Sequence, residues 1–282
     1  MSYVVILGAS GQVGRALSSL YPESSAYDHS TTIGGTDVTN MQRLEEMYRS
    51  EKPEIVINAT AFTNVDACEV EKDKAFAVNS SGVRNLAILC RKYSSKLIHI
   101  STDYVFSGTE GLYREGSTPD PINYYGFSKS IGEAYALSLE SSLIIRTSGV
   151  FGYGKNFPRF VYDSLRKSQS VDVIDGFYSP ITADLLSRSV KYLIDHNNEI
   201  NGILNIAGDR ISRFDLANVI ARTFDLEPSL IRSAHKLSGL KAPRPYDSSL
   251  DISKAKNIIN FDFHSLMANM DSFRTMLANS QI

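Results

Sequence analysis

Short apolar runs alternate with segments of helical periodicity through the first half of the chain. Runs rich in valine, isoleucine and leucine predict buried strands at residues 3–7, 55–59, 96–100 and 143–145. The apolar spacing in residues 75–93 and 131–139 instead predicts amphipathic helices. Strands separated by single helices are typical of an α/β fold with a doubly wound, Rossmann-type parallel sheet.

A glycine-rich turn follows the first predicted strand and leads into a helix. We expect Gly8 to permit the tight turn, Gly11 to let the backbone approach a diphosphate, and Gly14 to let the helix pack close to the sheet. The N-terminus of that helix would supply N–H donors to the phosphates. The strand before the glycines and the helix after them make the pattern indicative of dinucleotide binding.

Asp28 follows a weakly marked second strand at residues 26–27, twenty positions after Gly8. An acidic residue at about this spacing typically binds the adenosine ribose hydroxyls and repels a 2′-phosphate, which favours NADH. Because the strand is poorly defined, a solvated turn at Asp28 is an equally good interpretation. The other strand ends carry small or polar residues, and ligands of parallel sheets bind at these ends.

Tyr125 and Lys129 form the clearest chemical signature. Residues four apart share one face of a helix, so the phenol and the ammonium can meet at one ligand. A cation beside Tyr125 would lower the phenol pKa from its usual value of about 10 towards working pH, where it becomes an effective acid or base. With the hydroxyl of Thr102, these groups are suited to moving a proton while hydride moves at an alcohol carbon.

Composition and charge exclude several classes of protein. The 282 residues are 43% hydrophobic and 21% charged, and a net charge of −2 argues against binding nucleic acid through a basic surface. The apolar runs are too short to span a membrane. The two cysteines, Cys68 and Cys90, predict reduced thiols in a cytoplasmic protein. The histidines are scattered, so we expect no transition-metal site.

Seven motifs occur in the order typical of one enzyme family. They lie at residues 8–14, 37–39, 58–61, 65–69, 79, 101–106 and 125–129. Over essentially the whole chain, the sequence resembles an extended short-chain dehydrogenase/reductase and most of all the dTDP-4-dehydrorhamnose reductase family. The Ser-Thr-Asp-Tyr-Val-Phe run at 101–106 is the specific part, whereas the glycine turn and the Tyr/Lys pair are common to the superfamily.

The resemblance implies reduction of the 4-keto group of dTDP-4-dehydro-L-rhamnose by NADPH or NADH, giving dTDP-L-rhamnose. In the implied mechanism Thr102 binds the substrate carbonyl, Tyr125 protonates the developing alkoxide, and Lys129 holds the nicotinamide ribose. Substrate contacts are implied for Thr102, Asp103, Tyr125, Asn156 and Arg244. For Arg244, a solvated side chain in a proline-rich loop is an equally good interpretation.

The expected cofactor contacts are concentrated in the first half of the chain. They are Gly8, Ser10, Gly11, Gln12, Val13, Asp28, Asp37, Val38, Ala59, Ala61, Thr63, Tyr125 and Lys129. Asp66 and Glu69 match a family segment as well. Because a helix dipole favours carboxylates in the first turn, we interpret these two as helix-start and packing residues.

The resemblance also divides the chain unequally. Residues 1–150, with a returning segment at about 181–208, are expected to form the dinucleotide-binding domain. Residues 151–180 and 209–282 are expected to form a smaller sugar-nucleotide domain. The apolar spacing of residues 263–277 predicts a helix that covers the protein's own core, and a homodimer is left open.

Two departures from the family pattern and one difference from the dehydratases change the expectations. Gly149 stands where relatives usually carry a tryptophan that packs on the substrate, so these contacts must come from elsewhere. Tyr153, Phe157 and Tyr178 are candidates for stacking, although such residues are more often core or rim residues. Tyr104 follows the Thr-Asp pair where dehydratases carry glutamate, which disfavours a dehydratase. Ala16 stands where some relatives bind Mg²⁺ through a glutamate, so no such metal is expected.

Two other functions are compatible with the same residues. A sugar-nucleotide epimerase, or another nucleotide-sugar ketoreductase, uses the same Tyr/Lys pair. A non-catalytic NAD(P)-binding regulatory subunit, like the β subunit of methionine adenosyltransferase, keeps the fold without the reaction. The retained Thr102, Tyr125 and Lys129 favour catalysis.

Overall fold

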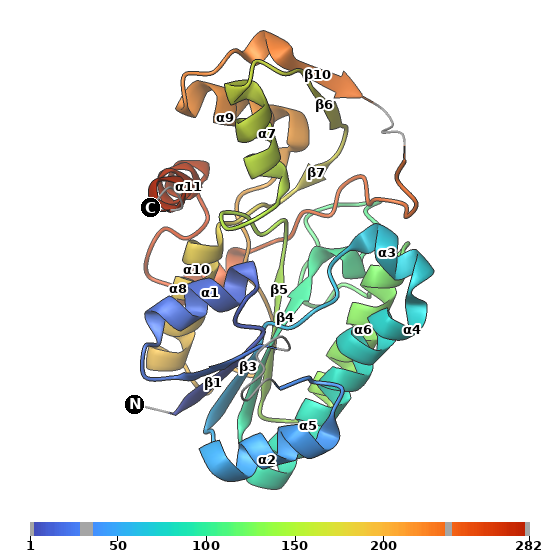
Figure 1. Ribbon diagram of the computed structural model, residues 1–282, viewed down its shortest axis with the longest axis vertical. Helices are drawn as coiled ribbons and strands as arrows, with labels where there is room; N and C mark the ends of the chain where they lie inside the picture. Colours follow the sequence, from blue (N-terminus) through green and yellow to red (C-terminus); the bar gives the residue numbers. More distant parts are fainter. Residues whose placement is uncertain (1–2, 29–35, 235–238, 280–282) are drawn as a thin grey trace.

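A six-stranded parallel sheet forms the centre of the larger part of the molecule (Figure 1). The computed structural model describes residues 3–28, 36–234 and 239–279. Neighbouring strands pair in the order β2-β1-β3-β4-β5-β8. Their bounds are β1 Val4–Leu7, β2 Ser25–Tyr27, β3 Ile55–Asn58, β4 Lys96–Thr102, β5 Ser142–Thr147 and β8 Gly202–Asn205. The predicted doubly wound parallel sheet is confirmed.

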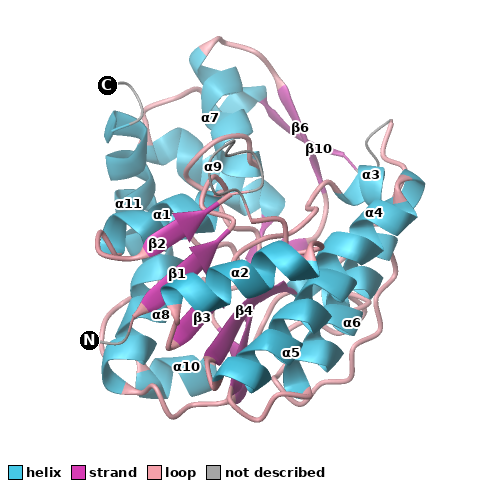
Figure 2. Ribbon diagram, turned by 60° about the horizontal axis from the view of Figure 1, so that its bottom comes forward, coloured by secondary structure: helices cyan, strands magenta, loops and turns pink. Residues whose placement is uncertain are grey.

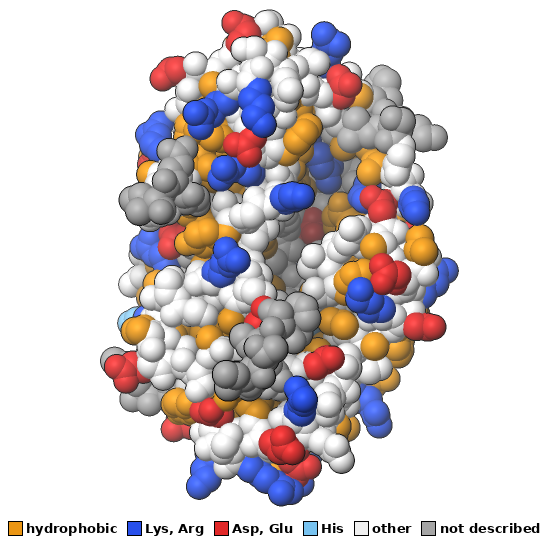
Figure 3. All heavy atoms as spheres, in the orientation of Figure 1, with side chains coloured by type: hydrophobic (Ala, Val, Ile, Leu, Met, Phe, Trp, Pro, Cys, Tyr) orange, Lys and Arg blue, Asp and Glu red, His pale blue; other side chains and the backbone are white. Residues whose placement is uncertain are grey.

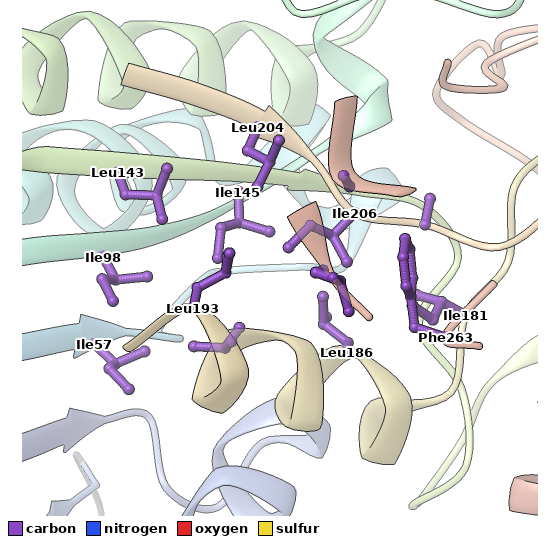
Figure 4. Packing of buried hydrophobic residues seen from close by; sticks show 14 of the residues in the cluster. Ile57, Ile98, Leu143, Ile145, Ile181, Leu186, Leu193, Leu204, Ile206 and Phe263 are labelled. Atoms are coloured by element: carbon purple, nitrogen blue, oxygen red, sulfur yellow. The ribbon is translucent and has the colours of Figure 1, made fainter. Parts of the chain in front are cut away.

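Helices cover both faces of this sheet (Figure 2). One face packs against α1, α8 and α10, and the other against α2, α5 and α6. Their bounds are α1 Gln12–Leu20, α2 Met41–Glu51, α5 Gly82–Tyr93, α6 Tyr124–Leu137, α8 Ala183–His196 and α10 Ser253–Ile258. On the first face, Leu186 and Leu193 of α8 pack against Ile98, Leu143 and Ile145 of the sheet (Figure 4).

The division into domains predicted from the sequence differs from the structure at residues 250–263. Leu250, Ile252, Ala255 and Phe263 belong to the same buried cluster as the sheet strands, although the prediction assigned them to the sugar-nucleotide domain. Residues 250–263 return to the larger part of the molecule because α10 packs on the edge strand β8. Residues 183–205 return as well, since β8 pairs with β5 and α8 packs on α1.

The smaller part of the molecule lies above the carboxyl ends of the strands (Figure 1). It holds the parallel pair β6–β10 and the antiparallel pair β7–β9. Its elements are α7 Phe157–Arg166, β6 Val171–Ile174, β7 Phe177–Tyr178, β9 Ile211–Ser212, α9 Arg213–Thr223, the 3₁₀ turn η3 Pro228–Leu230, β10 Ile231–Ala234 and α11 Leu266–Asn279. As predicted, α11 covers the protein's own core through Met270, Phe273 and Leu277, whereas Met267 is exposed.

The helix predicted over residues 75–93 is interrupted by a π-helical turn. Three segments follow one another, α4 Lys72–Phe76, the π turn η1 Ala77–Ser81 and α5. The extra turn carries buried Asn79, whose Oδ1 accepts from the Phe62 N–H at 2.8 Å and whose Nδ2 donates to the Phe62 carbonyl at 3.1 Å. Asn79 thereby fixes the loop between β3 and α3 Val65–Val70. π turns of this kind are frequent at functional sites.

Both cysteines are buried free thiols. Neither Cys68 nor Cys90 forms a disulfide, and Cys90 Sγ lies 3.0 Å from the Tyr48 hydroxyl. Within the described ranges, no helix combines the length and apolar character needed to cross a membrane.

Because α1 lies so close to the glycine turn, adding one methyl group at Gly14 should strongly lower the free energy of unfolding. A Cβ at Gly14 would lie 2.0 Å from the Gly8 carbonyl oxygen, so Gly14→Ala should lower the free energy of unfolding by about 1–3 kcal/mol. Gly116→Ala, whose Cβ would meet open space, should stay within about 0.5 kcal/mol of wild type. Urea unfolding measures both, and equal losses would contradict the close packing at Gly14.

Candidate active site

Two adjoining cavities lie at the carboxyl ends of the strands. The space-filling view shows this face hollowed between the upper and lower parts of the molecule (Figure 3). The glycine-turn cavity, of about 420 Å³, is lined by the turn after β1 and by the ends of β2 and β3. The tyrosine cavity, of about 390 Å³, is lined by the ends of β4 and β5 and the start of α6. Gly11, Ala59 and Ala61 line both, so the two are continuous.

Every residue predicted to contact the cofactor lines one of these cavities. The glycine-turn cavity gathers Gly8, Ser10, Gly11, Asp28, Asp37, Val38, Ala59 and Ala61. The tyrosine cavity gathers Gln12, Val13, Thr63, Tyr125 and Lys129, with Thr102 and Asp103 from the predicted substrate set. The contacts with a ligand stay predictions, but residues from six separate segments of the sequence share one continuous space.

The glycine turn has the geometry of an anion site. Gly8 adopts a φ of +85°, and a Cβ there would lie 2.8 Å from the Ala59 backbone. Gly11 is the N-cap of α1 and has no side chain to bond the first N–H groups of the helix. Because these donors face no capping side chain, they are available to a phosphate at the positive end of the helix dipole.

Asp103 gathers hydroxyl groups from three segments. It begins the 3₁₀ turn η2 Asp103–Val105 after β4. Its Oδ1 accepts from Thr102 at 3.0 Å, and its Oδ2 accepts from Ser148 at 2.7 Å and Ser248 at 2.5 Å. Burial raises the pKa of Asp103, although these hydrogen bonds favour the carboxylate. Single serines in loops give no sequence signal, which is why Ser148 and Ser248 were not predicted.

Tyr125 lies in the first turn of α6, which Asn123 caps by accepting from the Gly126 N–H at 2.8 Å. Burial raises the pKa of the Tyr125 phenol, and a hydrogen bond with Thr102 only partly offsets this. The sequence-based expectation of a lowered pKa therefore differs from the structure, because burial dominates and the opposing hydrogen bond comes from Thr102, not from Lys129. The ring of Tyr104 stands edge-on to Tyr125 at 5.9 Å between centroids.

Lys129 lies one turn further along α6 and is almost fully buried. Its Nζ donates to the Ile100 carbonyl at 2.7 Å and lies 3.2 Å from His99 Nε2. Burial lowers the pKa of Lys129 to about 8, against the opposite effect of the Glu133 carboxylate. The amine is thus held against β4 at the floor of the tyrosine cavity.

A buried ion pair fixes α6 to the sheet. Arg146 on β5 and Glu133 on α6 are both about 2–3% exposed, and they meet at 2.7 Å. Glu133 also accepts from the Ser101 hydroxyl on β4 at 2.5 Å. Neither Arg146 nor Glu133 was predicted as a site residue from the sequence. The sequence signal for this pair was Arg146, which follows directly after the apolar run of a predicted strand. An arginine at such a buried position needs a carboxylate partner.

Two predicted substrate contacts do not line the tyrosine cavity. Arg244 donates to the Asp66 carboxylate at 2.9 Å and to the Ala242 carbonyl at 2.8 Å. Asp66, in the first turn of α3, also accepts two backbone N–H groups from residues 241 and 242, so the loop is held to that helix. Asn156 caps α7 and donates to Gln12 Oε1 at 3.1 Å. Both side chains therefore hold segments together in this structure.

The place of the missing tryptophan is filled by another aromatic ring. Gly149 adopts a φ of +48°, and a Cβ there would lie 2.5 Å from the Tyr178 ring. Tyr178 is buried, with Arg213 stacked over it at 4.8 Å. Gly149 lines the tyrosine cavity, so Tyr178 packs directly behind this wall. Tyr153 and Phe157 lie in other surroundings, the first at a separate basic groove and the second against the core of the smaller part.

Among the described residues, no group of three or more histidine, cysteine or acidic side chains could hold a metal ion. Ala16, which stands at the family's Mg²⁺ position, is buried against Ala183 and Met276.

Comparison with known proteins identifies the family of this chain. The family model described as RmlD substrate binding domain matches residues 1–278. The chain belongs to the dTDP-4-dehydrorhamnose reductase family. A family member from Aggregatibacter actinomycetemcomitans, named dTDP-4-dehydrorhamnose reductase, is 33% identical, and the match covers 90% of this chain and 92% of that protein.

Solved structures of family members share the fold closely. A hypothetical dTDP-4-dehydrorhamnose reductase from Sulfolobus tokodaii is 43% identical with a TM-score of 0.89, covering 96% of this chain and 98% of that one. The Bacillus anthracis dTDP-4-dehydrorhamnose reductase, solved in complex with NADP, is 28% identical with a TM-score of 0.86 and covers 99% of each chain.

The buried Glu133–Arg146 pair predicts that a change at Glu133, which lies outside the cavities, strongly lowers the free energy of unfolding. Glu133→Gln leaves Arg146 without its counter-charge in the core, so the free energy of unfolding should fall by about 3–5 kcal/mol. Glu140→Gln, an exposed change just beyond the same helix, should alter it by less than about 0.5 kcal/mol. Denaturant unfolding of the two variants compares them, and a small loss for Glu133→Gln would mean that the pair does not hold α6.

Proposed function

We propose that this protein is an NAD(P)H-dependent reductase that converts the 4-keto group of dTDP-4-dehydro-L-rhamnose to the hydroxyl of dTDP-L-rhamnose. The observation that carries this is the convergence of Thr102, Tyr125 and Lys129 in a cavity continuous with the glycine turn. Family membership and the names of the relatives support the choice of substrate.

The residues present fit a dinucleotide. The uncapped N-terminus of α1 suits the diphosphate, and the adjoining cavities of about 420 and 390 Å³ suit the two nucleoside halves. Gly8, Gly11 and Ala59 keep side-chain atoms away from the backbone that a flat cofactor would contact. Tyr125 and Lys129 would hold the nicotinamide ribose at the other end. The bound cofactor supplies the hydride.

The protein's own part in the reaction is to hold the ketone and to deliver a proton. Thr102 would hydrogen-bond the substrate carbonyl, and the adjacent Tyr125 would protonate its oxygen as negative charge develops. The raised pKa of Tyr125 keeps the phenol protonated at working pH, which suits a proton donor in reduction. In this structure the Thr102 hydroxyl donates to Asp103, so it would turn this proton from the carboxylate to the ketone when substrate binds.

Two features favour reduction over the alternatives. Tyr104, where a dehydratase would need an acid, presents a ring edge to Tyr125. The three reactive side chains are retained and gathered, whereas a purely regulatory subunit has no need of them. Epimerisation stays open, because it uses the same tyrosine and lysine.

The choice of cofactor turns on Asp28. This carboxylate follows β2 and lines the glycine-turn cavity beside Thr36 and Asp37. A carboxylate there binds ribose hydroxyls and repels a 2′-phosphate, which supports NADH. The NADP found in the Bacillus anthracis relative supports NADPH instead.

An assay with both cofactors tests the proposed function. Incubation with dTDP-4-dehydro-L-rhamnose should oxidise one reduced cofactor per sugar reduced, and the Asp28 argument predicts tighter binding of NADH than of NADPH. Cofactor absorbance and chromatography of the sugar nucleotide give the two stoichiometries. Interconversion of sugars without net oxidation would identify an epimerase, and binding without turnover would identify a regulatory subunit.

Tyr125→Phe separates proton donation from binding. Turnover should fall by about 10²-fold or more, because the proton donor is lost, while the cofactor Kd should rise only by about 10-fold or less, because one ribose hydrogen bond is lost. Steady-state kinetics and cofactor titration measure these quantities. Tyr124→Phe changes the neighbouring tyrosine, which packs against Phe127 outside the cavity, and should behave as wild type. Parallel loss of turnover and cofactor binding in Tyr125→Phe would indicate a structural role.

A further inference from the structure

A buried histidine lies between Lys129 and the neighbouring strand, and the mechanism above does not use it. His99, on β4, has no exposed surface. Its Nε2 lies 3.2 Å from Lys129 Nζ, and its Nδ1 lies 3.1 Å from Asn58 Nδ2 at the end of β3. His99 therefore joins the reactive lysine to a fixed amide.

The orientation of the Asn58 amide determines which nitrogen of His99 carries a proton. Asn58 Oδ1 accepts from the Thr60 backbone N–H at 3.1 Å and from the Thr60 hydroxyl at 2.5 Å. Turning the amide over would place its NH₂ group against that backbone N–H, so that two donors faced each other. Asn58 Nδ2 must therefore donate to His99 Nδ1, which is unprotonated.

A neutral His99 then presents an N–H group to the lysine. Burial holds the pKa of His99 well below its usual value, so the ring is neutral with its proton on Nε2. Lys129 Nζ donates to the Ile100 carbonyl at 2.7 Å, and only its uncharged amine has a lone pair to accept from Nε2–H. An ammonium at the same place would face a donor.

We propose that His99 is a positioning residue that stabilises Lys129 as a neutral amine before cofactor binds, so that cofactor binding brings a proton to this lysine. The proton comes from solvent and converts the amine to an ammonium. This inference rests on the proposed function, because it places the nicotinamide ribose beside Lys129 and the cofactor diphosphate at the glycine turn of the adjoining cavity. Their negative charge and hydroxyl acceptors favour the ammonium form, which reverses the preference set by His99.

The other charged groups around Lys129 do not explain a neutral amine. Glu133, on the same helix, favours the ammonium form and is paired with Arg146 from β5. Asp103 and Tyr125 line the same cavity as Lys129. Within the described residues, the groups in hydrogen-bond contact with Nζ are the Ile100 carbonyl and His99, and of these two only His99 offers an N–H.

The first test needs no cofactor. Nitrogen-15 NMR of lysine-labelled protein follows the Lys129 Nζ signal, assigned by its loss in Lys129→Arg. The titration midpoint should lie near 8 in wild type and roughly one unit higher in His99→Phe, which keeps the burial but removes the donor. A wild-type lysine that remains an ammonium up to about pH 10 would overturn the proposal even if His99→Phe did not fold.

The second test measures protons taken up on cofactor binding. Calorimetry at about pH 8.5, in buffers of different ionisation enthalpy, should give about half a proton or more per cofactor in wild type and at most half of that in His99→Phe. His264→Gln removes a histidine paired with Asp209 away from the cavities, and should leave the uptake unchanged. Equal uptake in wild type and His99→Phe overturns the inference. Failure of wild type to bind either cofactor overturns the proposed function instead, and the NMR titration then decides the inference by itself.

Discussion

The buried contact between Glu133 and Arg146 sets the position of the helix on which the reactive residues lie. One carboxylate joins α6 to β5 through Arg146 and to β4 through Ser101, and these strands end at Thr147 and Thr102. An unpaired charge in the core is strongly unfavourable, so α6 can dock only where the pair forms. That position brings the first turn of α6, with its tyrosine, over the ends of the strands.

Burial, more than charge, governs the protonation of this site. Desolvation raises the pKa values of Tyr125 and Asp103 and lowers those of Lys129 and His99, so each group is shifted towards its neutral form. Burial thus favours the neutral form of these four groups before ligands arrive, in a protein whose net charge is only −2. Anionic ligands must then be held by backbone donors of the glycine turn and by side chains that gain charge on binding.

Two contacts between distant segments involve residues that were candidates for contacting the substrate. Tyr178 fills the space beside Gly149, and Arg213 stacks behind it. Arg244 is held by Asp66, so the loop that contains it is tied to α3. These contacts join the smaller part of the molecule to the strand ends, and they leave the convergence of Thr102 and Tyr125 unaltered.

The sequence by itself determined the parallel sheet and the glycine turn, because apolar periodicity and glycine spacing are local properties. The family resemblance supplied most of the other residues around the cavities. The sequence also predicted the Tyr125–Lys129 pair, since helical spacing puts both on one face. Only the tertiary structure decided that Arg244 is paired with Asp66, that residues 250–263 pack on the sheet, and that burial raises the Tyr125 pKa. Side-chain pairing and desolvation depend on contacts between segments far apart in the chain. The pattern of residues along the sequence does not determine how deeply these contacts bury a side chain.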